Sequence, residues 1–172
     1  MTSSTPLTGL RILVTGGTID KIYHPTEGRL RFERTHVLDM LQQARVQVCS
    51  DCVETVLLKD SLEMQYADRA SIAAACDRAD EKRLLITHGT DTMVETAAHL
   101  VDRVPGRTIV FTGAMVPFSV SQSDALFNFG FALAAARLLS AGVYVAMNGT
   151  VFPWDRVRKN REGGWFEDVD VA

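Results

Sequence analysis

Short runs of apolar residues alternate along the chain with longer stretches whose apolar residues recur at helical spacing. The first run, Leu10 to Thr15, is rich in branched residues and ends in Gly16-Gly17, which predicts a buried strand entering a tight turn. Similar strand-like runs lie at 84–87, 108–112 and 143–147, with a further strand region before Leu58, and helical spacing predicts helices at 35–44, 65–79, 93–104 and 124–140. This alternation is typical of βαβ units. The predicted fold class is α/β, a single doubly wound domain over residues 1–172 with a mostly parallel sheet.

Three segments depart from this pattern. Residues 20–31 lose their periodicity and collect turn-forming residues, which predicts a surface loop or loose hairpin. Residues 153–172 read as a polar C-terminal tail, the least predictable part of the chain. The helix after Asp124 is apolar nearly all round, so it is either buried on both sides or shared with another subunit. We therefore expect a homo-oligomer.

Composition and charge narrow the function classes. Apolar residues make up 47% and charged residues 23% of the 172 residues, as in ordinary packed proteins. Lys and Arg total 18 against 21 Asp and Glu, a net charge of -3, so there is no basic excess to attract nucleic acid. No stretch approaches the roughly 18 apolar residues of a membrane helix, and the opening segment lacks a signal-peptide pattern. The sequence predicts a cytoplasmic protein without membrane or nucleic-acid partners.

The cysteines offer a weak alternative. Cys49 and Cys52 have the C-x-x-C spacing of a redox pair or of half a zinc site, but a second pair is missing. Cys49 lies in an apolar stretch, and Cys76 belongs to the apolar face of a predicted helix. We interpret these thiols as small core groups rather than as redox or metal-binding groups.

Small and hydroxyl residues follow the predicted strands at 16–18, 88–91, 113–115 and 148–150. The carboxyl ends of parallel strands share one edge of a sheet, where ligands bind in such folds, so these segments should converge. Neither the G-x-G-x-x-G fingerprint nor a P-loop is present, which disfavours a nucleotide-binding protein.

Local patterns leave the roles of these residues open. Thr18 could bond its own backbone as an ordinary turn residue or offer a hydroxyl to a substrate. Thr92 with Glu95 fits a capping box, which would leave Thr90 and Asp91 free to face the cleft at a helix start that favours a carboxylate. His88 ends a strand and is interpreted as a structural hydrogen-bonding histidine rather than a general base.

Two of these segments, TGGTI at 15–19 and HGTDTM at 88–93, resemble the signature segments of the bacterial-type L-asparaginases. Supporting matches are Asp60-Ser61 with Met64, Gly113-Ala114-Met115 with Pro117, and Met147-Asn148 with Lys159. The resemblance spans about residues 10–160.

The resemblance implies an L-asparaginase, which hydrolyses L-asparagine to L-aspartate and ammonia through a covalent acyl-threonine intermediate. Thr18 would be the nucleophile, Tyr23 would orient its hydroxyl, and Lys159 with Asp91 would ease proton removal through Thr90 or its associated water. Ser61 would hold the α-carboxylate and Asp91 the α-amino group of the substrate. The implied substrate-binding set is Gly17, Asp60, Ser61, Gly89, Thr90 and Asp91. Neither a metal nor an organic cofactor is implied.

The sequence also departs from the family. Members are usually nearly twice as long, with a second domain that gives an acidic residue to the neighbouring subunit's site, so the resemblance is to a short-chain form lacking the C-terminal domain. Glu63, Glu162 and Glu167 are candidate replacements for that acid. Leu62 and Val116 stand where many members carry glutamine and arginine, which predicts weaker substrate binding and little glutaminase activity. The alternative is a non-catalytic asparagine- or aspartate-binding module, but such a module has no need of Thr18 or Lys159.

Overall fold

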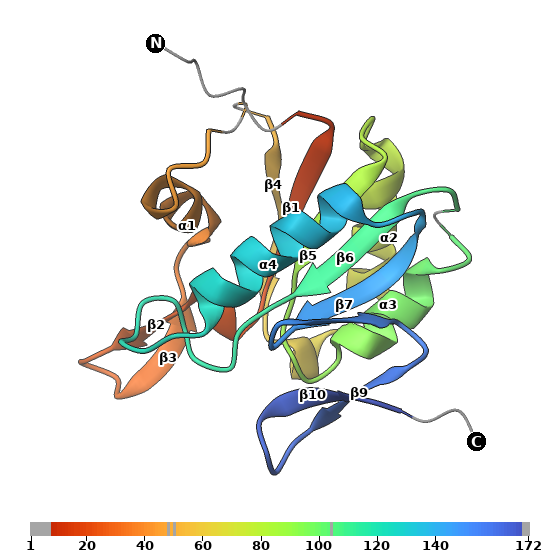
Figure 1. Cartoon of the computed structure of the whole chain (residues 1–172). Helices are drawn as coiled ribbons and strands as arrows, with labels where there is room; N and C mark the ends of the chain where they lie inside the picture. The colour runs from red at the N-terminus through yellow and green to blue at the C-terminus, as the bar shows by residue number, and fades with distance from the viewer. Residues whose placement is uncertain (1–7, 48, 50, 104, 170–172) are drawn as a thin grey trace.

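A six-stranded sheet lies at the centre of the protein, as shown by a computed structural model that describes residues 8–47, 49, 51–103 and 105–169 (Figure 1). The strand order is β4-β1-β5-β6-β7-β8, in which the first five strands are parallel and β8 is antiparallel to β7. The strands are β1 (Leu10–Gly16), β4 (Val53–Lys59), β5 (Arg83–Thr87), β6 (Thr108–Thr112), β7 (Gly142–Met147) and β8 (Thr150–Pro153). The predicted α/β class with a mostly parallel sheet is confirmed.

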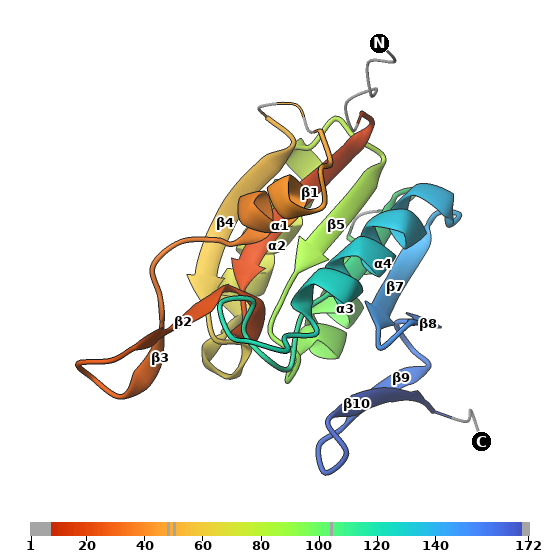
Figure 2. The same ribbon diagram turned by 60° about the vertical axis from the view of Figure 1, so that its left-hand side comes forward.

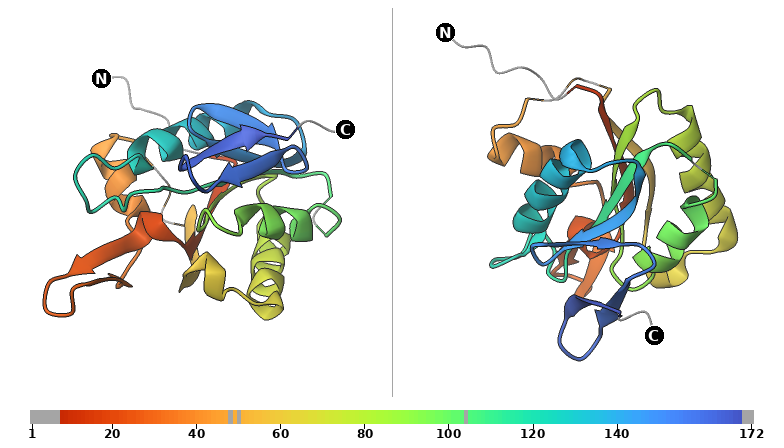
Figure 3. Two further views of the ribbon diagram at one scale, coloured as in Figure 1. Left: turned by 90° about the horizontal axis from the view of Figure 1, so that it is seen from below. Right: turned by 45° about the vertical axis from the view of Figure 1, so that its right-hand side comes forward.

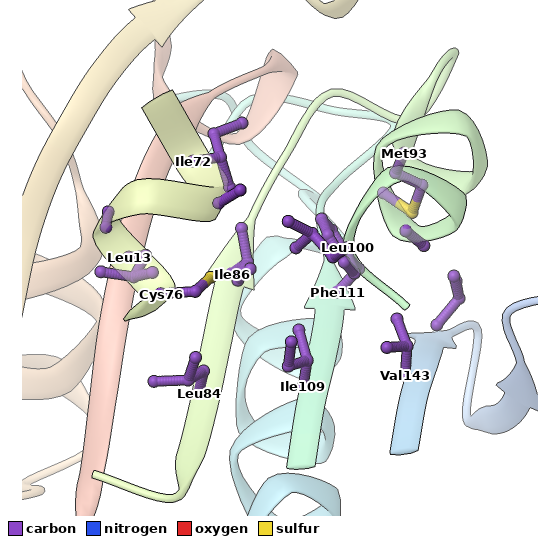
Figure 4. Close-up of a cluster of buried hydrophobic side chains, with 14 of the residues drawn as sticks. Leu13, Ile72, Cys76, Leu84, Ile86, Met93, Leu100, Ile109, Phe111 and Val143 are labelled. Atoms are coloured by element: carbon purple, nitrogen blue, oxygen red, sulfur yellow. The ribbon is translucent and has the colours of Figure 1, made fainter. Parts of the chain in front are cut away.

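Helices cover both faces of the sheet (Figure 3). They are α1 (Val37–Gln43), α2 (Tyr66–Arg78), α3 (Met93–Leu100) and α4 (Ala125–Leu138). One hydrophobic cluster packs α2 and α3 on the sheet, and a second packs α1 and α4 on the opposite face. Along β5, Leu84 and Ile86 point into the first cluster and Leu85 into the second (Figure 4 shows the first). Because both faces are covered, the central strands β1, β5 and β6 are nearly continuous apolar runs rather than alternating ones.

The strand order places a topological switch point between β1 and β5. The chain passes from β1 outward to β4 and then returns to the other side of β1 as β5, after which β6 and β7 add in sequence. Ligands in open parallel sheets bind outside the carboxyl ends of the strands at such a reversal. The fold therefore predicts a ligand-binding site beside the segments that follow β1 and β5.

Two small antiparallel hairpins lie beyond the carboxyl ends of the parallel strands (Figure 2). One pairs β2 (Lys21–His24) with β3 (Arg29–Phe32), so of the two forms predicted for residues 20–31 the hairpin is correct. The other pairs β9 (Val157–Asn160) with β10 (Trp165–Asp168). Within 153–169 the predicted polar tail is thus largely a hairpin, and residues 170–172 lie outside the described part. Two short 3-10 helices, η1 (Thr18–Asp20) and η2 (Ser61–Glu63), follow β1 and β4.

Several local predictions at the helices need correction. Helix α1 begins at Val37 rather than near residue 35, and within it Leu38 is exposed while Met40 is buried. Thr92 does occupy the N-cap position of α3, but the predicted capping box is wrong because its hydroxyl donates to the carbonyl of Ser61 at 2.8 Å. Position 104, predicted to end this helix's apolar face, lies outside the described residues.

The cysteine prediction is right for Cys76 and wrong for Cys49. Cys76 is a buried free thiol in the α2 cluster, and burial raises its pKa to about 12. Cys49 is exposed and forms a disulfide with the buried Cys52, with the two Cα atoms 5.4 Å apart.

Across the part of the chain that the structure describes, no helix is long and apolar enough to cross a membrane.

Candidate functional site

Two consecutive glycines end β1 and bring η1 against the neighbouring strand ends. Gly16 and Gly17 have φ of 89° and 85°, a region that side chains disfavour. A Cβ at position 16 would collide with the backbone of Lys59, and one at position 17 with the backbone of Gly89. The Gly17 N–H donates to the Lys59 carbonyl at 3.0 Å. Thr18 therefore begins its turn, half-buried, directly beside the segment that follows β5.

The segment after β4 packs into the same place. Asp60 caps η2 by accepting from the Leu62 N–H at 3.0 Å. Ser61 is buried, and a Cβ on Gly89 would collide with its side chain, so both positions of this contact need small residues. The Ser61 Oγ has no hydrogen-bond partner among the described residues, which leaves a hydroxyl unused within the predicted substrate-binding set.

Lys159 joins the second predicted segment. Its Nζ donates to the Thr90 Oγ1 at 2.7 Å and to the Asp91 Oδ1 at 2.9 Å. The Lys159 side chain is only 16% exposed and that of Asp91 27%, so this ion pair is partly shielded from water. Arg161 approaches the same Asp91 oxygen at 3.6 Å but is largely exposed. The structure thus brings Lys159 into contact with Thr90 and Asp91, which lie 69 and 68 residues away in sequence.

Lys159 reaches Thr90 because the β9–β10 hairpin is fixed to the end of β7. Asn148 adopts a left-handed backbone with φ of 54°, which asparagine tolerates, and its Oδ1 accepts from the Phe166 N–H at 2.9 Å. The Asn148 N–H donates in turn to the Oδ1 of the buried Asn128 on α4 at 3.1 Å. Val157 and Phe166 are buried in the α2 and α3 cluster. These contacts, together with strand pairing, orient the hairpin toward Thr90.

Tyr23 is placed differently from the other predicted site residues. It lies on β2 with 57% of its surface exposed, and among the described residues no hydrogen bond joins it to Thr18. Its neighbour Lys21 was not singled out from the sequence, yet its Nζ forms an ion pair with the Oδ2 of Asp60 and lies 5.6 Å from the ring centroid of Phe32. Only the fold reveals this pair, because 39 residues separate its members.

Charge and burial set the protonation of two groups near the site. Burial of Asp60 favours its neutral form, but hydrogen bonds from Lys21 and the Leu62 N–H outweigh this and lower the pKa of its carboxyl. Burial lowers the pKa of His88 to about 4, so it is neutral at pH 7. Its Nδ1 lies 2.8 Å from the Gly89 carbonyl and its Nε2 lies 2.9 Å from the Thr96 Oγ1. With the proton on Nδ1, both ring nitrogens are satisfied, as expected of a structural histidine.

The three glutamates considered as replacement acids differ in their surroundings. Glu167 accepts hydrogen bonds from Arg158, Asn160 and Trp165 within its own hairpin. These bonds, above all that from the Asn160 amide, hold the pKa of the Glu167 carboxyl below its usual value. Glu162 is exposed in the β9–β10 turn. Glu63 lines a hollow of about 460 Å³ that also includes Lys21 and Asp60. Of the three, Glu63 lies nearest to the predicted substrate-binding segment along the chain.

A second hollow, of about 250 Å³, is lined by Thr90, Asp91 and Lys159 together with residues of α3 and the β9–β10 hairpin. Neither lining includes Thr18. Among the described residues, no group of three or more His, Cys, Asp or Glu side chains is arranged to hold a metal ion. The arrangement instead offers hydroxyls, a lysine and carboxylates, which are groups suited to nucleophilic and acid–base chemistry.

Comparison with known proteins gives a consistent result. The sequence model of the family described as Asparaginase, N-terminal, matches residues 9–164. The L-asparaginase of Thermococcus kodakarensis is 31% identical over 154 residues, which cover 87% of this chain and 47% of that protein. Its solved structure superposes with a TM-score of 0.80 at 32% identity, covering 95% of this chain and 52% of that one.

A second solved structure, described as a probable cytoplasmic L-asparaginase from Campylobacter jejuni, has a TM-score of 0.78 at 25% identity, covering 94% of this chain and 53% of that one. The chain spans about half the length of these relatives.

Proposed function

The chain belongs to the asparaginase family, and on that premise we propose that it hydrolyses L-asparagine to L-aspartate and ammonia through a covalent acyl-threonine intermediate. One observation carries the proposal. The Lys159 Nζ is shared between Thr90 and Asp91 at 2.7 and 2.9 Å, and Gly89, the residue before Thr90, packs against Gly17, the residue before Thr18. A lysine that bridges a threonine and an aspartate at a topological switch point is suited to proton transfer, and a turn threonine on the adjoining segment is suited to attack.

In the proposed reaction the Thr18 Oγ1 attacks the side-chain amide carbon of asparagine. The Thr18 proton passes through Thr90 or its associated water, assisted by Lys159 and Asp91, and reaches the amide nitrogen, which leaves as ammonia. Water then attacks the acyl-threonine ester, which releases aspartate and restores the Thr18 hydroxyl. Backbone N–H groups at the α3 start and near the glycine turn are the natural donors to the tetrahedral oxyanion, apart from the Gly17 N–H, which donates to the Lys59 carbonyl.

Substrate binding is proposed to use the small-residue contact between Gly17, Gly89 and Ser61. The unpartnered Ser61 hydroxyl supports a role in holding the α-carboxylate, because a buried donor without a partner is costly and a bound anion would satisfy it. Asp91 is assigned the α-amino group, and its Oδ1 is already engaged by Lys159. Asp60 is held by Lys21 and is proposed to border the substrate rather than to react.

Tyr23 is proposed to act only when the β2–β3 hairpin brings it over Thr18, since its exposed position lacks a contact with that residue in the described part of the structure. We also propose little glutaminase activity, because Leu62, 64% exposed beside Ser61, offers no polar group to a longer substrate. Comparable kcat/KM values for glutamine and asparagine would contradict this specificity.

Ammonia release from asparagine by the wild type and by Thr18→Ala tests the central proposal. We expect activity from the wild type, its loss in Thr18→Ala, and identical circular dichroism spectra. Thr55→Ala is the matched control, because Thr55 is exposed on β4 away from the site. Equal rates for Thr18→Ala and Thr55→Ala would disprove the threonine mechanism.

A further inference from the structure

A buried carboxylate follows the proposed nucleophile by two residues. Asp20 ends η1, the same 3-10 turn that begins at Thr18, and its side chain is fully buried. Its Oδ1 accepts two hydrogen bonds from the segment before α1, from the Thr35 Oγ1 at 3.0 Å and from the His36 N–H at 2.7 Å. Its Oδ2 has no partner among the described residues.

The backbone around the same turn is also held by another segment. The Ile19 carbonyl accepts from the Phe118 N–H at 3.3 Å, and the Lys21 carbonyl accepts from the Ser119 Oγ at 2.9 Å. Both donors belong to the loop between β6 and α4. Residues 19 and 21 take part through their backbone, so any side chain could occupy them as far as these bonds are concerned. Asp20 is different, because its contact is made by the side chain.

Burying the Asp20 carboxylate between two segments costs free energy. Burial raises the pKa of Asp20 because it disfavours the charged form, and the bonds from His36 and Thr35 only partly offset this. An apolar contact would hold the turn at a lower free-energy cost, but it would not fix the orientation of η1. Two donors converging on one oxygen define where that carboxyl lies, and hence the rotation of a one-turn helix that also carries Thr18.

We propose that Asp20 is a positioning residue, whose hydrogen bonds to Thr35 and His36 set the orientation of the Thr18 hydroxyl. This inference rests on the proposed function insofar as it concerns catalysis. Asp20 does not contact the reacting atoms in this scheme. It acts through the geometry of η1.

The test compares Asp20→Ala, Thr35→Ala and Asp20→Asn with Asp39→Ala as the matched control. Asp39 lies on α1 and contacts the ring of His36 at 3.0 Å, so its loss perturbs the same helix without touching η1. Because small misplacements of reacting groups cost about 10²-fold in rate, kcat per folded molecule should fall by about that factor in Asp20→Ala, with KM near the wild-type value. Thr35→Ala removes one of the two bonds and should lose less. Asp20→Asn keeps an acceptor oxygen and should restore most of kcat.

A second measurement reads the orientation without activity. In protein labelled with ¹³C at threonine methyls, the Thr18 resonance is identified by its absence in Thr18→Ser. It should shift in Asp20→Ala and Thr35→Ala and stay unchanged in Asp39→Ala. An unmoved Thr18 resonance together with control-like kcat would overturn the inference. If Asp20→Ala does not fold, Thr35→Ala against Asp39→Ala decides in the same way.

The two arms also separate this inference from the proposed function. A wild type that releases no ammonia would contradict the asparaginase proposal, whereas the methyl resonance would still report whether Asp20 orients Thr18.

Discussion

Lys159 donates to two oxygens at once, and this double contact makes it the residue whose removal should affect chemistry most directly after Thr18. Lys159→Met keeps much of the aliphatic volume but leaves Thr90 and Asp91 without their shared donor. Because a positioned acid–base group contributes about 10²–10⁴-fold to rate, we expect kcat for asparagine to fall within that range. Steady-state ammonia release is the measurement.

Lys82→Met is the control for this substitution, since Lys82 is exposed before β5. A Lys159→Met enzyme as active as Lys82→Met would exclude Lys159 from the reaction.

His88 should make stability depend on pH. Its pKa in the folded protein is lowered to about 4 by burial, whereas the unfolded value is about 6.5. Between these values the unfolded chain binds a proton that the folded chain does not, so the free energy of unfolding falls as the pH drops from 6.5 to 4. The full difference is on the order of 3 kcal/mol.

Urea denaturation at pH 7, 5 and 4 measures this dependence. His88→Gln should be less stable at pH 7 but should show a flatter dependence, whereas Thr55→Ala, a change at an exposed residue of β4 without a titratable group, should keep the wild-type slope. Parallel curves for His88→Gln and the wild type would show that another group titrates.

The motifs in the sequence predict Thr18, Thr90, Asp91 and Lys159 as site residues, although the local pattern of Thr18 alone favours an ordinary turn. The structure brings the last three into contact. Asp20 and Lys21 escaped notice because a single charged residue after a strand is normally a solvated one. Their partners lie 15 to 39 residues away in sequence, so only tertiary structure reveals the contacts.

At the scale of elements, one side chain ties the β9–β10 hairpin to the end of β7. Asn148→Gly keeps the left-handed backbone accessible but removes the acceptor for the Phe166 N–H. We expect the hairpin to open more often, so trypsin should cleave faster at the basic residues of 156–161 and kcat should fall as Lys159 loses its support. Limited proteolysis followed by mass spectrometry measures the first effect.

Asn148→Asp is the control for the hairpin, because aspartate also tolerates this conformation and keeps an acceptor oxygen. Faster cleavage in Asn148→Asp equal to that in Asn148→Gly would point to a cause other than the lost hydrogen bond.

Element prediction succeeded where burial on both faces makes patterns strong, as in β1, β5 and β6. It was weaker at boundaries, since the start of α1 depends on the distant Asp20 accepting from the His36 N–H as well as on the local bond from the Val37 N–H to the Thr35 Oγ1. The capping box at Thr92 failed for a similar reason: the Ser61 carbonyl competes for the hydroxyl. The hairpin after residue 153 was unpredictable because its short strands are held by Asn148 and by the core rather than by their own periodicity.

For the whole molecule, we expect α4 to determine whether copies associate. Its inner face is buried, but Phe127 is 63% and Leu138 84% exposed. We propose a homo-oligomer that covers this outer face. Phe127→Lys should then lower the mass measured by light scattering, whereas Leu62→Lys, on an exposed apolar residue elsewhere, should not. A monomeric wild type across working concentrations would contradict the proposal.

The long sequence separation between Lys159 and Thr90 predicts the order of events during folding. Lys159 meets Thr90 across 69 residues, and it does so only after the final strand and hairpin are in place. Contacts of such long range form late because closing a long loop costs entropy before it is rewarded. During refolding from urea, helical circular dichroism should therefore recover before the ability to release ammonia does. A folding intermediate formed between these two steps would contain native helices and yet release no ammonia.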